Sequence, residues 1–142
     1  MSTSGIAPAR SEGLRIFSKV PYSLLTTFKR DGTRVAVPIW QAVGDDKIYM
    51  FTEARSWKVK RLRRDARIEI TTCDMRGRTD GSPTWTGTGR VVDDKPGIAR
   101  AYKALDDKYG WQKWIVDTLS KISGRYDSRA ILEITLDETA KA

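Results

Sequence analysis

The residues best suited to chemistry in this chain form a basic segment that follows Thr52. From Arg55 to Arg67 the segment contains seven Arg and Lys residues against one Asp, a net charge of +6 out of +8 for the whole chain. Ser56 has the residue type of a helix N-cap, and Lys58 lies two positions after it. Because a helix N-terminus has free N–H groups and a partial positive charge, this pattern favours a bound phosphate. An ordinary capped surface helix is the alternative interpretation.

A second candidate is the run Val-Ala-Val-Pro-Ile-Trp at residues 35–40. Pro38 has no N–H to give to a sheet, so it belongs at an edge or a bulge, where neighbouring backbone groups can meet a ligand. Trp40 adds a flat ring with one hydrogen-bond donor. The alternative is a kinked edge strand whose tryptophan packs in the core.

The residue types that are missing narrow the possible chemistry. The 142 residues include no histidine, which excludes Ser-His and Cys-His catalysis, histidine metal sites and imidazole acid–base chemistry. Cys73 is the only cysteine, so the chain has no internal disulfide and no thiolate zinc cluster, and we expect a buried thiol without a redox role. The sequence predicts no metal site and nominates no catalytic side chain. If the chain is an enzyme, a bound organic cofactor supplies the reactive group.

The elements that must position these residues are predicted to be mainly strands. Alternating and β-forming residues predict six of them, over residues 22–28, 33–40, 47–52, 67–73, 84–92 and 129–136. Asp31 and Gly32 form the turn of a first hairpin. Gly87 and Gly89, inside the fifth strand, indicate a bend or the close approach of another group.

Helical periodicity occurs in several of the remaining segments. Ser56 precedes a short basic helix in which Val59 and Leu62 face inward. Further helices are expected over residues 12–19, 94–110 and 111–124. Because strands and helices alternate irregularly, we expect a mainly β, α+β fold: a six-stranded antiparallel barrel with helices packed on its outside.

The chain is expected to form one folded unit. Residues 1–10, rich in Ser, Ala and Pro, are predicted to be a flexible N-terminus, and residues 11–142 a single barrel domain. The start lacks the apolar run of a signal peptide, and no stretch approaches about 18 apolar residues. We therefore expect a soluble, cytoplasmic protein that does not contact a membrane.

Three stretches together resemble a known family. They are Tyr-Ser-Leu-Leu-Thr-Thr-x3-Asp-Gly-Thr from Tyr22, Val-Pro-Ile-Trp from Val37, and Tyr-Met-Phe-Thr-x3-Ser-x-Lys-x-Lys-Arg-Leu-Arg-Arg-Asp-Ala-Arg from Tyr49. Over residues 16–136 the pattern is similar to the pyridoxamine 5'-phosphate oxidase-like split β-barrel proteins. The Ser-x-Lys-x-Lys-x-Leu-Arg-Arg part resembles the actinobacterial branch that binds the deazaflavin coenzyme F420 instead of FMN.

The resemblance implies a homodimer with two cofactors bound in grooves between the barrels. By position, it implies that Ser56 and Lys58 contact the cofactor phosphate. It implies that Lys60 and Arg61 contact the phosphate or the polyglutamate tail. These expectations agree with the charge of the basic segment, since F420 carries a phosphodiester and several glutamate carboxylates.

The resemblance also implies which residues lie beside the cofactor ring. It implies that Val37, Pro38 and Trp40 lie along the deazaflavin and that Thr52 lies near the ribityl chain. FMN-using relatives tend to have Arg directly before the Lys of the motif, where this chain has Trp57. This departure favours F420 over FMN.

We therefore expect an F420-dependent oxidoreductase that transfers a hydride between the deazaflavin and a small unsaturated or quinone-like substrate. The alternatives are an FMN-binding flavin reductase or oxidase-like protein and a non-catalytic F420 carrier. Nucleic-acid binding through the basic segment ranks below these, because the segment is short and has no groove-reading motif, so no nucleic-acid partner is expected.

Overall fold

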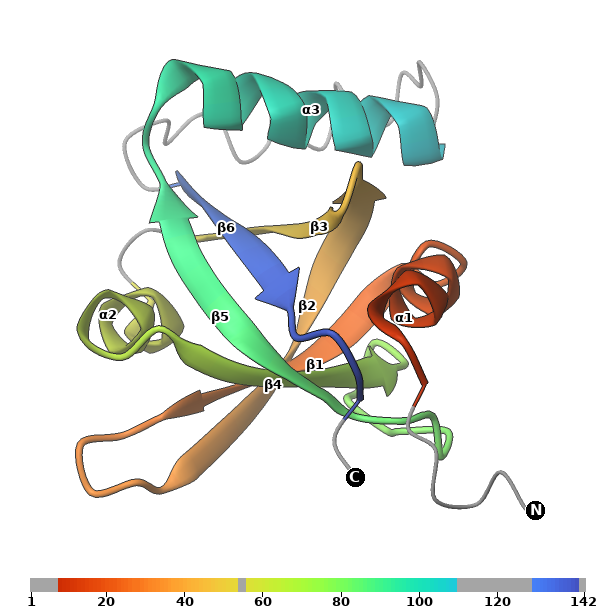
Figure 1. Ribbon diagram of the computed structural model, residues 1–142. Coiled ribbons are helices and arrows are strands. Elements are labelled where there is room, and N and C mark those ends of the chain that lie inside the picture. Colours follow the sequence, from red (N-terminus) through yellow and green to blue (C-terminus); the bar gives the residue numbers. More distant parts are fainter. Residues whose placement is uncertain (1–7, 54–55, 110–128, 141–142) are drawn as a thin grey trace.

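The computed structural model describes residues 8–53, 56–109 and 129–140 (Figure 1). These residues form three helices and six strands. In chain order the elements are α1 (Arg10–Phe17), β1 (Tyr22–Phe28), β2 (Arg34–Gly44), β3 (Lys47–Glu53), α2 (Trp57–Arg64), β4 (Arg67–Cys73), β5 (Trp85–Val92), α3 (Lys95–Tyr109) and β6 (Arg129–Leu136). The helix predicted over residues 111–124 lies outside the described residues.

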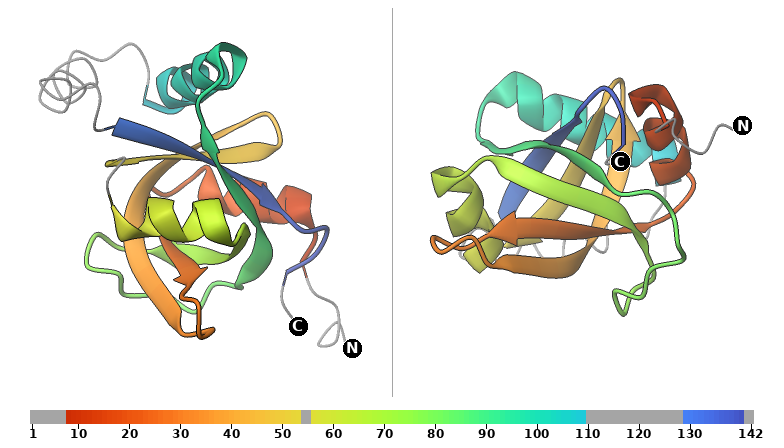
Figure 2. Two further views of the ribbon diagram at one scale, coloured as in Figure 1. Left: turned by 90° about the vertical axis from the view of Figure 1, so that its left-hand side faces the viewer. Right: turned by 60° about the horizontal axis from the view of Figure 1, so that its bottom comes forward.

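The six strands close into one barrel in the order β1-β2-β3-β6-β5-β4. Every neighbouring pair of strands is antiparallel. Figure 2 shows the three helices around this barrel, with α3 lying along its wall. The expected mainly β, α+β fold, with six antiparallel strands and peripheral helices, is confirmed.

Two short turns connect the first three strands. Between β1 and β2, Gly32 has a φ of 88°, and the Thr33 N–H donates to the Asp31 carboxylate at 2.9 Å. The hairpin predicted from Asp-Gly is confirmed, because glycine adopts this left-handed backbone without strain. Between β2 and β3 a two-residue turn suffices, with Asp45 at a φ of 55°.

Strand β2 is longer than the sequence predicted and changes partner along its length. The prediction ended this strand at Trp40, but β2 continues to Gly44. Residues 34–40 pair with β1, whereas residues 41–44 pair with β3. On the side away from β1, residues 34–39 therefore have no ladder partner among the described strands, and we call them the open stretch of β2. Pro38 lies in this stretch, as expected for a residue that cannot donate to a ladder.

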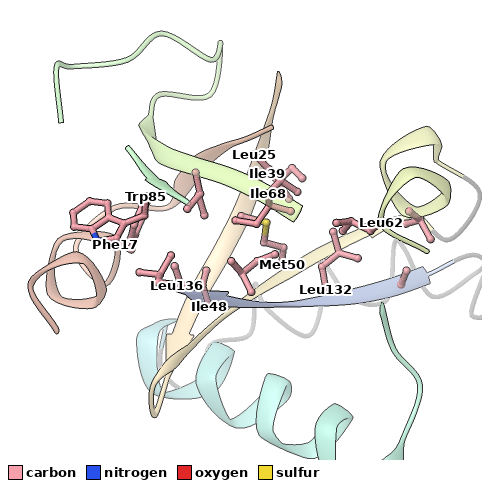
Figure 3. Packing of buried hydrophobic residues seen from close by; sticks show 14 of the residues in the cluster. Phe17, Leu25, Ile39, Ile48, Met50, Leu62, Ile68, Trp85, Leu132 and Leu136 are labelled. Carbon is pink, nitrogen blue, oxygen red and sulfur yellow. The ribbon is translucent and has the colours of Figure 1, made fainter. Parts of the chain in front are cut away.

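Apolar side chains from all six strands fill the barrel (Figure 3). Phe17 of α1 packs edge-to-face on Trp85 at one end, with ring centroids 5.6 Å apart. Val59 and Leu62 of α2 pack into the same core, and Figure 3 shows Leu62 at the opposite end from Trp85. Burying side chains of this size contributes about 1.5–3 kcal/mol each. The strand residues of the core include Leu25, Ile39, Ile48, Met50, Ile68, Ile70, Leu132, Ile134 and Leu136.

A close approach between β5 and β6 explains the glycines of β5. A Cβ on Gly87 would lie 2.2 Å from the carbonyl oxygen of Thr135. A Cβ on Gly89 would lie 2.9 Å from Ile134 Cδ1. The close approach predicted from these two glycines is confirmed: a Cβ on Gly87 would clash with backbone, and one on Gly89 would press on the end of the Ile134 side chain.

Helix α3 covers the outer face of β2, β3 and β6, where a second apolar cluster lies (Figure 1). Asp94 accepts the Gly97 N–H at 2.9 Å and so caps the start of this helix, as the sequence suggested. Within the described ranges, no helix combines the length and apolar character needed to cross a membrane. The buried residues of the cluster are Ala42, Tyr49, Val92, Ala101, Ala104, Leu105 and Ile131.

The first and last described residues are hydrogen-bonded to each other. Ala9 forms a bridge with Thr139, and the Ala140 N–H donates to the Pro8 carbonyl at 2.8 Å. The sequence placed Pro8 and Ala9 in a flexible stretch of residues 1–10. In the structure they are instead fixed beside the end of β6, and α1 begins at Arg10.

Candidate anion-binding site

Helix α2 begins beside an unused hydroxyl group. Ser56 occupies the N-cap position with extended backbone angles (φ −67°, ψ 155°), so the predicted cap position is confirmed. Its side chain, however, makes no capping hydrogen bond. Ser56 Oγ is buried and has no hydrogen-bond partner within the described part of the chain. Because a buried hydroxyl without a partner costs free energy, this helix end favours a polar ligand group.

Two cations of α2 lie close to each other on one side of the helix. Lys58 is half-buried, and Arg61 is only 9% exposed. Burial lowers the pKa of Lys58; the Glu53 carboxylate partly offsets this effect, and the positive charge of Arg61 lowers the pKa further. Burial also lowers the pKa of Arg61, with a smaller contribution from Arg64. Two like charges withdrawn from water in this way favour an anion beside them.

Arg61 is held from outside its own helix. Its Nε–H donates to Oγ1 of Thr27 in β1 at 2.7 Å, and Thr27 is 1% exposed. Sequence reasoning missed Thr27, because 34 residues separate it from Arg61 and only barrel closure brings the two together. The available signal was its position: Thr27 alternates with Leu25 and so shares the inward face of β1.

Lys60 lies on the exposed side of α2. Its Nζ is 4.5 Å from the ring centroid of Trp57, whose side chain is 70% exposed. The structure therefore brings Lys58 and Arg61 together on one side of α2 and leaves Lys60 apart from them. Lys60 and Trp57 form a cationic and aromatic surface next to the first turn of the helix.

The three candidate residues of β2 do not share one side-chain face. Val37 alternates with the core residue Ile39 and packs against the barrel core. Pro38 and Trp40 project from the opposite face, where the Trp40 ring meets Phe51 with centroids 6.2 Å apart. A ligand that met all three residues would therefore contact their backbone edge rather than a continuous side-chain surface.

Thr52 lies at the same end of the barrel as α2. It is opposite Ala130 in the ladder between β3 and β6, and it shares the inward face of β3 with Met50. Strand β3 ends at Glu53, the residue after Thr52, and α2 begins at Trp57. Thr52 is therefore positioned near the barrel end that α2 closes.

Cys73, the single cysteine of the sequence, lies in the described part of the chain. Cys73 is buried, and burial raises the pKa of its thiol, with further contributions from the negative charges of Asp74 and Asp80. The burial expected for this thiol is confirmed, and a thiol with a raised pKa is a poor nucleophile. The described site supplies three hydrogen-bond donors: the hydroxyl of Ser56, the ammonium of Lys58 and the guanidinium of Arg61. Together these groups suit a phosphate ester.

Residues 11–141 match the family described as pyridoxamine 5'-phosphate oxidase. Among curated proteins, none matches the chain.

Solved structures share the fold over nearly the whole chain. A conserved hypothetical protein from Mycobacterium tuberculosis is 22% identical, with a TM-score of 0.71, over 98% of this chain and 87% of that one. A putative pyridoxamine 5'-phosphate oxidase from Listeria innocua is 15% identical, with a TM-score of 0.60, over 91% and 94% of the two chains. HutZ, a heme storage protein from Vibrio cholerae, is 10% identical, with a TM-score of 0.66, over 94% of each chain. At these identities the likenesses establish a common fold.

Proposed function

The chain belongs to the pyridoxamine 5'-phosphate oxidase family, and on that premise we propose that it binds coenzyme F420 and transfers a hydride between the deazaflavin and a small unsaturated or quinone-like substrate. The observation that carries this proposal is the start of α2. There the buried Ser56 hydroxyl, which has no hydrogen-bond partner among the described residues, is followed by Lys58 and Arg61, two mutually repelling cations. Such a group of donors fits the phosphate of a flavin-like cofactor.

In this proposal the chain's own residues bind and orient the cofactor. Ser56 donates its hydroxyl hydrogen to a phosphate oxygen, and Lys58 and Arg61 neutralise the phosphate charge. Thr52, at the same barrel end, lies beside the ribityl chain, and the backbone edge of Val37 to Trp40 borders the ring. When bound, the deazaflavin supplies the hydride chemistry, which agrees with a sequence without histidine.

We prefer F420 over FMN because the basic segment carries more positive charge than a single phosphate group needs. The segment from Arg55 to Arg67 has a net charge of +6, more than one phosphate requires. Lys60 and Arg63 are exposed on α2, where they can meet the carboxylates of a polyglutamate tail. Trp57 replaces the Arg that FMN-using relatives tend to have, and this removes one phosphate donor.

Heme binding is less well supported than flavin-type binding. One structural neighbour is named as a heme storage protein. This chain has no histidine, so no imidazole can ligate a heme iron, and its single cysteine is buried. The donors at the start of α2 instead favour a phosphate-bearing cofactor.

We also propose that two copies of the chain pair as a homodimer with the cofactor between them. The open stretch of β2 supports this, because it contains the partly exposed Val35, Val37 and Pro38 next to a strand edge that no described strand pairs with. Trp57 and Met75 are large apolar side chains that are 70% and 67% exposed. Apolar surface of this kind is covered when subunits associate.

A titration of the purified protein with F420 and with FMN tests the cofactor assignment. Cofactor fluorescence or tryptophan quenching reports binding, and we expect tighter binding of F420, with an affinity that falls steeply as salt is added. Tighter binding of FMN would overturn the assignment. The same sample, given reduced F420 and quinone-like acceptors, is expected to oxidise the cofactor; tight binding without any turnover would identify a carrier instead.

A further inference from the structure

Arg61 differs from the other cations of α2 in its surroundings. Lys60, Arg63 and Arg64 are exposed and Lys58 is half-buried, whereas Arg61 is buried at the end of the barrel. An arginine rarely occupies such a position unless its donors are satisfied, because withdrawing a guanidinium from water is costly. The position of Arg61 therefore needs an explanation in terms of its partners.

Thr27 satisfies only part of the Arg61 guanidinium. The Nε–H donates to Thr27 Oγ1 at 2.7 Å, while no hydrogen bond or ion pair from the two terminal nitrogens to any described residue is present. A guanidinium held at Nε has lost its rotational freedom, and its terminal N–H groups point in a fixed direction. These are the groups that bind a phosphate in a bidentate manner.

The charge around Arg61 is unbalanced on the same side of the helix. Arg61 adds to the positive potential at Lys58, and among the described residues only Glu53 opposes it there. Arg64, a further cation near Arg61, donates to the Phe28 carbonyl at 2.6 Å, next to Thr27 in β1. The end of β1 therefore holds two arginines of α2 in place and supplies no negative side chain to either.

From this geometry we infer that Thr27 is a positioning residue of the anion site: it fixes Arg61 through Nε so that the terminal nitrogens are presented to a phosphate ester. The inference rests on the proposed function, because the phosphate ester is that of the cofactor. Thr27 itself contacts no ligand in this arrangement. It acts through the orientation of Arg61, before the ligand arrives, and so reduces the entropy lost on binding.

Two deazaflavins test this role: F420, and the deazaflavin alcohol that ends at the ribityl group without phosphate or tail. Their dissociation constants are measured for the wild type, Thr27→Val and Thr27→Ser. Valine keeps the shape but removes the acceptor, whereas serine keeps the hydroxyl. We expect Thr27→Val to weaken F420 binding about tenfold, which corresponds to the loss of one hydrogen bond to a charged group. The affinity for the alcohol stays unchanged, and Thr27→Ser restores F420 binding.

The outcomes separate the two proposals. If the wild type binds both deazaflavins equally, there is no phosphate site at α2, and the proposed function and the role of Thr27 are both overturned. If the wild type prefers F420 and Thr27→Val retains that preference, only the role of Thr27 is wrong. Equal losses for both ligands would show that Thr27 merely stabilises the fold, which also overturns the inference.

A double-mutant cycle with Arg61→Ala gives a second readout. In the positioning role, Thr27→Val has no further effect on F420 binding once Arg61 is alanine. An undiminished effect in that background contradicts the inference. If Thr27→Val does not fold, Thr27→Cys replaces it in both experiments, because a thiol is only a weak acceptor.

Discussion

Gln41 of β2 and Lys108 of α3 donate to the same two carbonyl oxygens, those of Phe17, the last residue of α1, and of Val20. Gln41 Nε2 lies 2.8 Å from the Phe17 oxygen and 3.0 Å from the Val20 oxygen. Lys108 Nζ donates to both and also to the Gln41 carbonyl, at 3.2 Å. The two side chains thereby join α1, β2 and α3, and they supply hydrogen-bond donors to carbonyl groups at and just beyond the end of α1.

The position of Lys108 predicts how stability depends on pH. Burial lowers its pKa to about 8 from an ordinary value of 10.5. Between these two pH values the unfolded chain binds the proton more tightly than the folded chain does, so the free energy of unfolding rises with pH across this window. Urea denaturation at pH 7, 8.5 and 10 measures the effect. Lys108→Met should show a smaller rise, while the exposed Lys19→Met should keep the full one; parallel pH profiles for wild type and Lys108→Met would contradict the prediction.

Lys58→Ala is expected to weaken F420 binding by about 1.5–3 kcal/mol, the range for a hydrogen bond to a charged group. The half-buried ammonium is the first cation after the N-cap, so its loss removes both a donor and a charge from the site. Fluorescence titration gives the dissociation constants. Lys19→Ala, which removes an equal charge after α1, is the matched control and should bind as the wild type does. An unchanged dissociation constant for Lys58→Ala would remove Lys58 from the site.

Gly87→Ala is expected to destabilise the barrel by about 3 kcal/mol, the upper end of the usual cost of overpacking, because its Cβ would lie 2.2 Å from a backbone oxygen of β6 that cannot move aside alone. Gly32→Ala is the control: its φ of 88° also disfavours alanine, but a Cβ there meets no atom within 4 Å. We expect a cost of only about 1–2 kcal/mol for it. Thermal and urea unfolding compare the two, and equal losses would show that backbone conformation, rather than the β5–β6 contact, requires Gly87.

The elements with strong local signals were predictable. The Asp-Gly pair at residues 31 and 32 predicts the first turn. The spacing of Val59 and Leu62 predicts the buried side of α2. Both patterns depend only on residues that are close in sequence. The extent of β2 was not predictable in the same way. Its alternation continues unchanged past Trp40, while the partner changes from β1 to β3 at a point that only the closed barrel determines.

For the candidate site, the sequence identified the donors but not their arrangement. Spacing on a helix correctly placed Lys58 and Arg61 on one side. Helical spacing could not show that the Ser56 hydroxyl makes no capping hydrogen bond, nor that Thr27 accepts a hydrogen bond from Arg61. Both features depend on where α2 meets the barrel. That Val37, Pro38 and Trp40 lie along the cofactor ring stays a prediction; because side chains alternate along a strand, the three could meet a ring only through their backbone edge.

The place of β6 between β3 and β5 has a consequence for biosynthesis. Strand β6 is synthesised after the other five strands, and it joins the free edges of β3 and β5. The nascent chain therefore cannot complete its barrel until residues 129–136 have left the ribosome. Until then β3 and β5 present unpaired edges to other chains, which is the condition under which β-proteins aggregate. Premature termination before β6 is therefore expected to yield insoluble fragments rather than a smaller folded protein.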